Sequence, residues 1–162
     1  MYAEDDAMGS FQMKIVILAP TVRLHLVDYH RTVFYEYLDD YDLFIYSEDD
    51  MRANAALVAN YLIQTRKVKR LLGNNPKLAS DYNVGVIRYE YNYPFDVIID
   101  DNTRMLTRNA TRVYWEHSQG RPVFEKVVDE VENPALAGEF MTLRNTHQGM
   151  FLATQDLLRA WK

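Results

Sequence analysis

The sequence predicts an α/β domain with a mixed sheet and flanking helices, on three observations. Two apolar runs, residues 13–19 and 42–47, have the composition of short buried strands. Between them, from about residue 24 to 39, apolar side chains recur at steps of three and four, which is one face of a helix. A second helix follows, and the rest of the chain is mostly strand-like. This order is typical of an α/β layer whose sheet holds parallel and antiparallel strands.

Length and composition limit the classes of protein. With 162 residues the chain fits one domain, which we expect over 12–162, after an acidic, unpatterned leader at 1–11 that we expect to be disordered. The net charge of −5 argues against a nucleic-acid-binding surface. No stretch approaches the roughly 20 apolar residues of a membrane span. The absence of cysteine excludes disulfides and thiolate metal sites and is compatible with either redox compartment.

The first two strands should be joined by the first helix. A right-handed crossover would make residues 13–19 and 42–47 neighbouring parallel strands. His30 lies on the apolar stripe of that helix, where a satisfied, partly buried histidine is the favoured interpretation over a site role. Arg31 beside it could face an anion.

A stronger helix is predicted over residues 54–72. Asn54 is suited to the N-cap, and Gly73 follows as the expected C-terminal glycine. Basic residues crowd its last turns. We interpret them as a complement to the helix dipole, in preference to a nucleic-acid patch. They are Arg66, Lys67, Lys69 and Arg70.

The second half of the chain is strand-like, with one ambiguous segment. The segment 124–134 fits either a short helix or a loop followed by a strand. Residues 150–162 are predicted to close the chain as an amphipathic helix. The strand candidates are 82–91, 95–100, 111–117 and 140–145.

The acidic end of the second strand is the first candidate for chemistry. The apolar run ends in Glu48, Asp49 and Asp50. Open α/β sheets bind ligands beyond the carboxyl ends of their strands, and carboxylate oxygens suit Mg²⁺ and Mn²⁺. Three adjacent acids repel one another, so a cation or solvent must relieve them. A solvated acidic loop is the alternative interpretation.

Three further polar groups lie at strand ends. Arg88 and Glu90 share one face of their strand, whereas Glu116 and His117 point to opposite faces of theirs. The polar loop 145–150 carries His147 and a glycine, and its backbone donors could meet an anion or a metal. Each group alone also fits ordinary strand-end polarity.

Taken together, these groups resemble GT-A-type glycosyltransferases, in which an apolar strand delivers the acidic DXD motif. The similarity is greatest to a eukaryotic family of uncharacterised glycosyltransferase-like proteins. The resemblance covers roughly residues 24–162. The motifs that carry it are HR (30–31), YDLFIYSEDDM (41–51), RYE (88–90), YWEH (114–117) and HQGMFLAT (147–154).

The resemblance implies a nucleotide-sugar-dependent transferase with Mn²⁺ or Mg²⁺ between the acids and the donor diphosphate, and a glycan or protein as acceptor. It implies three sets of residues. The metal ligands are Asp50, Asp49 and His147; the nucleotide-sugar contacts are Glu48, Asp49, His30, Arg31 and Arg88; the candidate catalytic bases are Glu116 and Glu90. We therefore expect Asp50, Glu116 and His147 around a single cleft.

One departure from the family leaves alternatives open. Only one strand precedes the acidic one here, so the resemblance implies a partial GT-A-like domain that lacks its first βα units. The alternatives are a non-catalytic fragment that binds a sugar or a partner, and a metal-dependent phosphoesterase. The resemblance places the full-length protein in the Golgi or secretory lumen, where the sequon at Asn109 would be exposed and outside the cleft.

Overall fold

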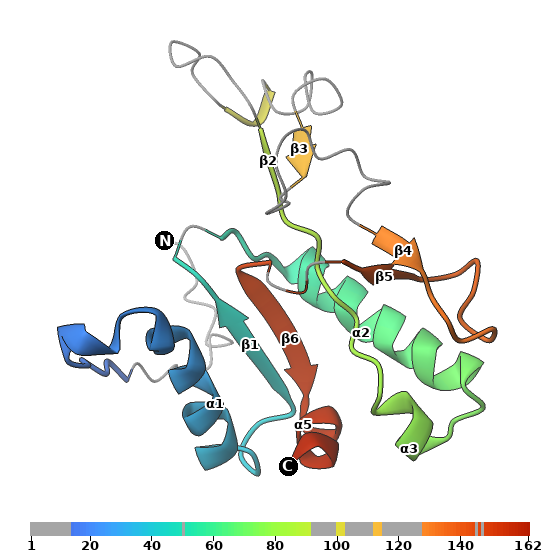
Figure 1. The fold of residues 1–162 in the computed structure, drawn as a ribbon, viewed down its shortest axis with the longest axis horizontal. Helices are drawn as coiled ribbons and strands as arrows, with labels where there is room; N and C mark the ends of the chain where they lie inside the picture. The colour runs from blue at the N-terminus through green and yellow to red at the C-terminus, as the bar shows by residue number, and fades with distance from the viewer. Residues whose placement is uncertain are drawn as a thin grey trace, which may run out of the picture.

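A computed structural model of the chain describes residues 14–49, 51–91, 100–102, 112–114, 128–144, 146 and 148–162. The described helices lie mainly in the first half of the chain, and the strands β2 to β6 follow one another in the second half before the last helix (Figure 1). A 3₁₀ helix at Pro20–His25 leads into α1. The elements are α1 (Leu26–Glu36), β1 (Leu43–Ser47), α2 (Ala55–Leu71), α3 (Pro76–Ala79), β2 (Tyr89–Tyr91), β3 (Arg112–Tyr114), β4 (Val128–Glu130), β5 (Met141–Leu143), β6 (Met150–Thr154) and α5 (Gln155–Trp161).

The centre of the molecule is the antiparallel pair of β1 and β6. Phe44 lies opposite Ala153, and Ile45 lies opposite Leu152. Because successive strand residues point to opposite faces, Phe44 and Ala153 share one face of this two-stranded ribbon, and Leu152 lies on the other. Both faces are apolar, so the ribbon needs cover on both sides.

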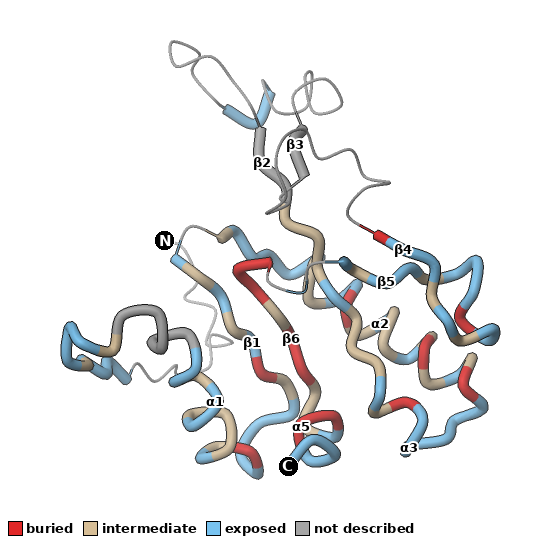
Figure 2. The backbone as a smooth tube through the Cα atoms, viewed as in Figure 1, coloured by how far each residue is buried: buried red, intermediate tan, exposed pale blue. Residues whose placement is uncertain are grey.

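A helix covers each face of the ribbon. On one side Phe34 of α1 and Leu38 just after it pack with Phe44 and Ala153. On the other side Tyr61 of α2 packs with Leu152, which is fully buried. Figure 2 shows buried residues along β6 and α5, and also on α2 and the turns beside it. The result is a core of helix, ribbon and helix.

The prediction of a long second helix is confirmed by α2. Asn54 accepts a hydrogen bond from the Leu57 N–H at 2.9 Å, and Gly73 follows the helix with a φ of +66°. Glycine adopts this left-handed conformation without the steric cost that a Cβ brings. Two of the basic residues near its end form ion pairs: Lys67 pairs with Glu139, and Lys69 pairs with Asp156 of α5.

The prediction of a buried first strand is wrong. Residues 14–19 form no strand, and the side chains of Ile15 and Ile17 are 77% and 90% exposed. Lys14 instead holds this segment to the end of α1 through Glu36 and Tyr37. The parallel pairing with residues 42–47 is therefore also wrong, since β1 pairs antiparallel with the C-terminal β6.

The expected mixed sheet is replaced, within the described residues, by three antiparallel pairs: β1–β6, β2–β3 and β4–β5. The chain therefore combines helices with small antiparallel sheets, and the described strands include no parallel pair. Residues 150–154 form the strand β6 and are not the start of the last helix. The helix α5 begins only after them, because Thr154 is its N-cap and its side chain accepts a hydrogen bond from the Leu157 N–H.

The remaining expectations for the second half are met in part. Residues 140–145 contain β5, and the segment 124–134 contains β4 at Val128–Glu130, while 124–127 lie outside the described residues. Residues 82–88 lie outside any strand, so only the end of the candidate 82–91 forms β2. The leader at 1–11 and nearly all of 95–100 lie outside the described residues. Within the described part, every helix is too short or too polar to cross a membrane.

We predict that Leu152→Ala lowers the free energy of unfolding by about 2–5 kcal/mol, because it leaves a cavity between the ribbon and α2. Ile63→Ala is the matched control, since Ile63 lies on α2 and is 57% exposed. Its expected change is within about 0.5 kcal/mol. Urea unfolding measures both. Equal losses would contradict a core centred on β6.

We also predict that alkali destabilises the protein through Tyr61. Burial raises the pKa of this hydroxyl above its ordinary value of 10.0. The folded state therefore keeps a proton that the unfolded state releases, so stability is full below about pH 10 and falls as pH rises toward the folded pKa. Tyr61→Phe should flatten this fall in urea unfolding measured across that range. An unchanged slope would contradict it.

Candidate functional site

The acidic block lies where the carboxyl end of β1 meets the amino end of β6. Glu48 donates its backbone N–H to the carbonyl of Gly149 at 2.8 Å, and Met51 donates its N–H to the carbonyl of Glu48 at 3.2 Å. These bonds form a turn at the end of β1. Asp49 is exposed on this turn. The antiparallel pairing thus brings Glu48 beside Gly149, about one hundred residues away.

Arg88 joins the acidic block to the same place. Its Nη1 lies 3.8 Å from Oε2 of Glu48, and the side chains of Arg88 and Glu48 are only 14% and 26% exposed. The backbone N–H of Arg88 donates to Oε1 of buried Gln148 at 2.8 Å. Residues of the acidic block, the RYE block and the HQG block therefore contact one another directly.

Gly149 is required at this junction for two reasons. Its φ of +68° is in the left-handed region. A Cβ at this position would lie 2.9 Å from Oε2 of Glu48 and 3.3 Å from Nη1 of Arg88. A side chain here would therefore displace the ends of the Glu48 and Arg88 side chains.

Tyr46 and His30 extend the site along the face covered by α1. The pKa of the Tyr46 hydroxyl is raised by burial first, then by the negative charge of Glu48 and a hydrogen bond to it. The ring of His30 stacks 4.5 Å from that of Tyr46 and makes edge contacts with Phe34 and Phe151. This position agrees with the favoured interpretation of His30 as a partly buried, satisfied residue.

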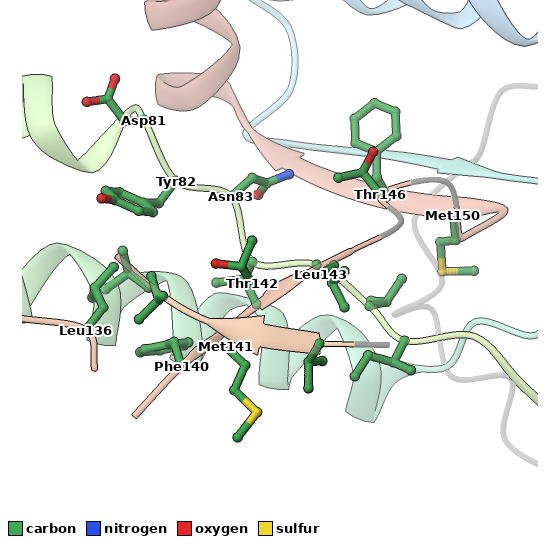
Figure 3. A pocket seen from close by; sticks show the side chains of 18 of the residues that line it. Asp81, Tyr82, Asn83, Leu136, Phe140, Met141, Thr142, Leu143, Thr146 and Met150 are labelled. Carbon is green, nitrogen blue, oxygen red and sulfur yellow. The ribbon is translucent and has the colours of Figure 1, made fainter. Parts of the chain in front are cut away.

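A hollow adjoins the junction. Figure 3 shows part of its lining, with Thr146 and Met150 at one end and Tyr82 and Phe140 at the other. The hollow also reaches the face of α1. There its lining residues are His30, Arg31, Tyr46 and Phe151. Residues of the HR block, the acidic strand and the HQGMFLAT block therefore border one concave surface.

Several predicted site residues lie outside what the structure describes. These are Asp50, Glu116 and His147, together with Asn109 of the sequon, so the expected cleft around the first three is untested. The backbone of Glu90 lies in β2, opposite Val113, and its side chain is outside the description. Arg31 is exposed, and its guanidinium is 3.8 Å from Asp28.

The described residues alone do not form a metal site. No three histidine or acidic side chains among them gather closely enough to hold an ion. Of the described candidate ligands, Asp49 is exposed and Glu48 is engaged with Arg88. Two of the three metal ligands that the resemblance implies are not among these residues.

The residues predicted from the sequence include Glu48, Arg88 and the glycine of the 145–150 loop, but not two of their neighbours, Gln148 and Tyr46. Gln148 stands in the same loop as His147, whose imidazole is the more typical ligand. Tyr46 looked like one more apolar residue of the strand. Its place two positions before Glu48, on the same side of an extended strand, was the signal that could have identified it.

Comparisons of the chain with models of known protein families, with characterised proteins and with solved structures gave no match.

We predict that Gly149→Ala destabilises the fold more than Gly73→Ala. Both glycines have nearly the same left-handed φ, +68° and +66°, so both variants carry a backbone cost of about 1–2 kcal/mol. Only at Gly149 does the new methyl group also meet Glu48 and Arg88, since nothing lies within 4 Å at Gly73. Urea unfolding measures the difference. Equal costs would show that the junction is not closely packed.

Proposed function

We propose that this chain is a metal-dependent glycosyltransferase domain of GT-A type, which moves a sugar from a nucleotide-sugar donor to a hydroxyl group of a glycan or protein. The observation that supports the proposal is the junction at the end of β1, where Glu48, Arg88 and Gly149 meet. These residues come from three of the five blocks on which the resemblance rests. The strand pairing accounts for the meeting of Glu48 and Gly149, and Arg88 is brought to the same place from outside that pair of strands.

The charges at this junction suit a nucleotide diphosphate with its cation. Asp49, with Asp50 and His147, would hold Mn²⁺ or Mg²⁺, and a metal held by few carboxylates leaves positions for phosphate oxygens. When bound, the ion supplies Lewis-acid stabilisation of the leaving diphosphate. Arg88 adds a fixed positive charge beside the acidic turn.

The hollow beside the junction suits the rings of the substrates. His30, Tyr46 and Phe151 give it an aromatic wall, on which a sugar or a base can pack. Arg31 and Thr146 add polar groups at its border. In an inverting reaction Glu116 or Glu90 would accept the proton of the acceptor hydroxyl as general base.

A second candidate is a domain that binds a sugar or a partner without turnover. It is favoured by one observation, the engagement of Glu48 with Arg88, which leaves fewer acids for a metal. No binding of a nucleotide diphosphate would be expected in that case, with or without a metal.

We predict that Asp50→Asn abolishes manganese-dependent binding of a nucleotide diphosphate. The substitution keeps the shape of the side chain but removes one negative charge and a strong oxygen ligand. The fold should survive, since the change relieves repulsion among adjacent acids. Calorimetric titration of UDP and GDP, with and without Mn²⁺, measures the effect.

Asp42→Asn is the matched control for this experiment. Asp42 is exposed and immediately precedes β1, at the opposite end from the acidic block. It should bind as wild type does. Binding that is independent of Mn²⁺, or that survives Asp50→Asn, would contradict the mechanism. Absence of binding in the wild type would favour the domain without turnover.

A further inference from the structure

The two described acids of the acidic block lie in different surroundings. The side chain of Glu48 is 26% exposed, whereas Asp49 lies exposed at the next position. Oε2 of Glu48 lies 3.8 Å from Nη1 of Arg88, whose side chain is only 14% exposed. Glu48 is thus turned toward the protein and Asp49 toward the surface.

Glu48 supplies a countercharge to Arg88. A guanidinium that is only 14% exposed has lost most of its hydration, and such a charge is tolerated when it is paired. A divalent cation that took Glu48 as a ligand would compete with Arg88 and place two positive charges together. Glu48 is therefore poorly suited to ligate a metal, although it is the first acid of the block.

The backbone of Glu48 also makes two hydrogen bonds that hold the turn at the end of β1. Its N–H donates to the carbonyl of Gly149, and its own carbonyl accepts from the N–H of Met51. The turn that carries Asp49 is therefore held to β6 through the main chain of Glu48. The same residue holds it to the segment that precedes β2, through the side chain of Arg88.

We propose that Glu48 is a positioning residue, which acts through Arg88 and Gly149 to hold the acidic turn in place, and that it is not a ligand of the metal. The inference rests on the proposed function, because it leaves the cation to Asp49 and Asp50. It departs from the expectation that Glu48 contacts the donor.

A double-mutant cycle on metal affinity tests this assignment. The variants are Glu48→Gln, Arg88→Met and the double variant, with Asp42→Asn as control. Affinity for Mn²⁺ alone is measured by electron paramagnetic resonance of the free ion, and thermal melting monitors the fold. Loss of a residue that orients a ligand typically costs about 10–100-fold in metal affinity, which is the expected effect of Glu48→Gln.

The sign of the Arg88→Met effect separates the two roles. If Glu48 is a positioning residue, Arg88→Met alone weakens Mn²⁺ binding, because it removes a contact that holds Glu48, whereas in the Glu48→Gln background it adds little, because that contact is already lost. If Glu48 is a ligand, Arg88→Met alone strengthens binding, because it removes a competing cation. That result, or an unchanged affinity in Glu48→Gln, overturns the proposal.

Three further outcomes are also decisive. If Glu48→Gln does not fold, Glu48→Asp takes its place, because it keeps the charge and withdraws the carboxylate from Arg88; an unchanged affinity then overturns the proposal. If the wild type binds Mn²⁺ but neither UDP nor GDP, the proposed function fails while the cycle still decides the role of Glu48. If the wild type does not bind Mn²⁺, both fail.

Discussion

The antiparallel pairing of β1 with β6 is the constraint on which the rest of the structure depends. It joins residues 43–47 to 150–154, and so brings together segments from the two halves of the chain. Two helices lie on the two faces of this ribbon because both faces are apolar. The pairing also sets the register that places Glu48 beside Gly149, so the candidate site is a direct consequence of the core.

Local features of the fold were predictable from the sequence, and the long-range pairing was not. The second helix could be placed because Asn54, the apolar stripe and Gly73 act within a few residues of one another. The strand partner of β1 is decided by contacts between residues far apart in the sequence, and several apolar runs of the chain could have formed them. Ile15 and Ile17 looked like core residues, yet they are exposed, and β1 pairs with the run MFLAT.

The candidate site was predictable as a set of residues but not as an arrangement. Charged residues at strand ends pointed to Glu48 and Arg88, since such positions commonly carry function. Their mutual contact could not be foreseen, because it depends on Gln148 and Gly149, whose roles are a hydrogen bond to a backbone N–H and a lack of side chain. Neither role leaves a pattern in a single sequence.

The most direct test of a cation site at the end of β1 is paramagnetic broadening of backbone amide signals as Mn²⁺ is added to isotope-labelled protein. The ion broadens nearby amides whatever reaction the protein performs. The account predicts that the amides of Asp49, Arg88 and Gly149 broaden first and together, although Arg88 and Gly149 are distant from Asp49 in sequence. Broadening centred on exposed acids elsewhere, such as Asp39 or Asp156, would contradict it.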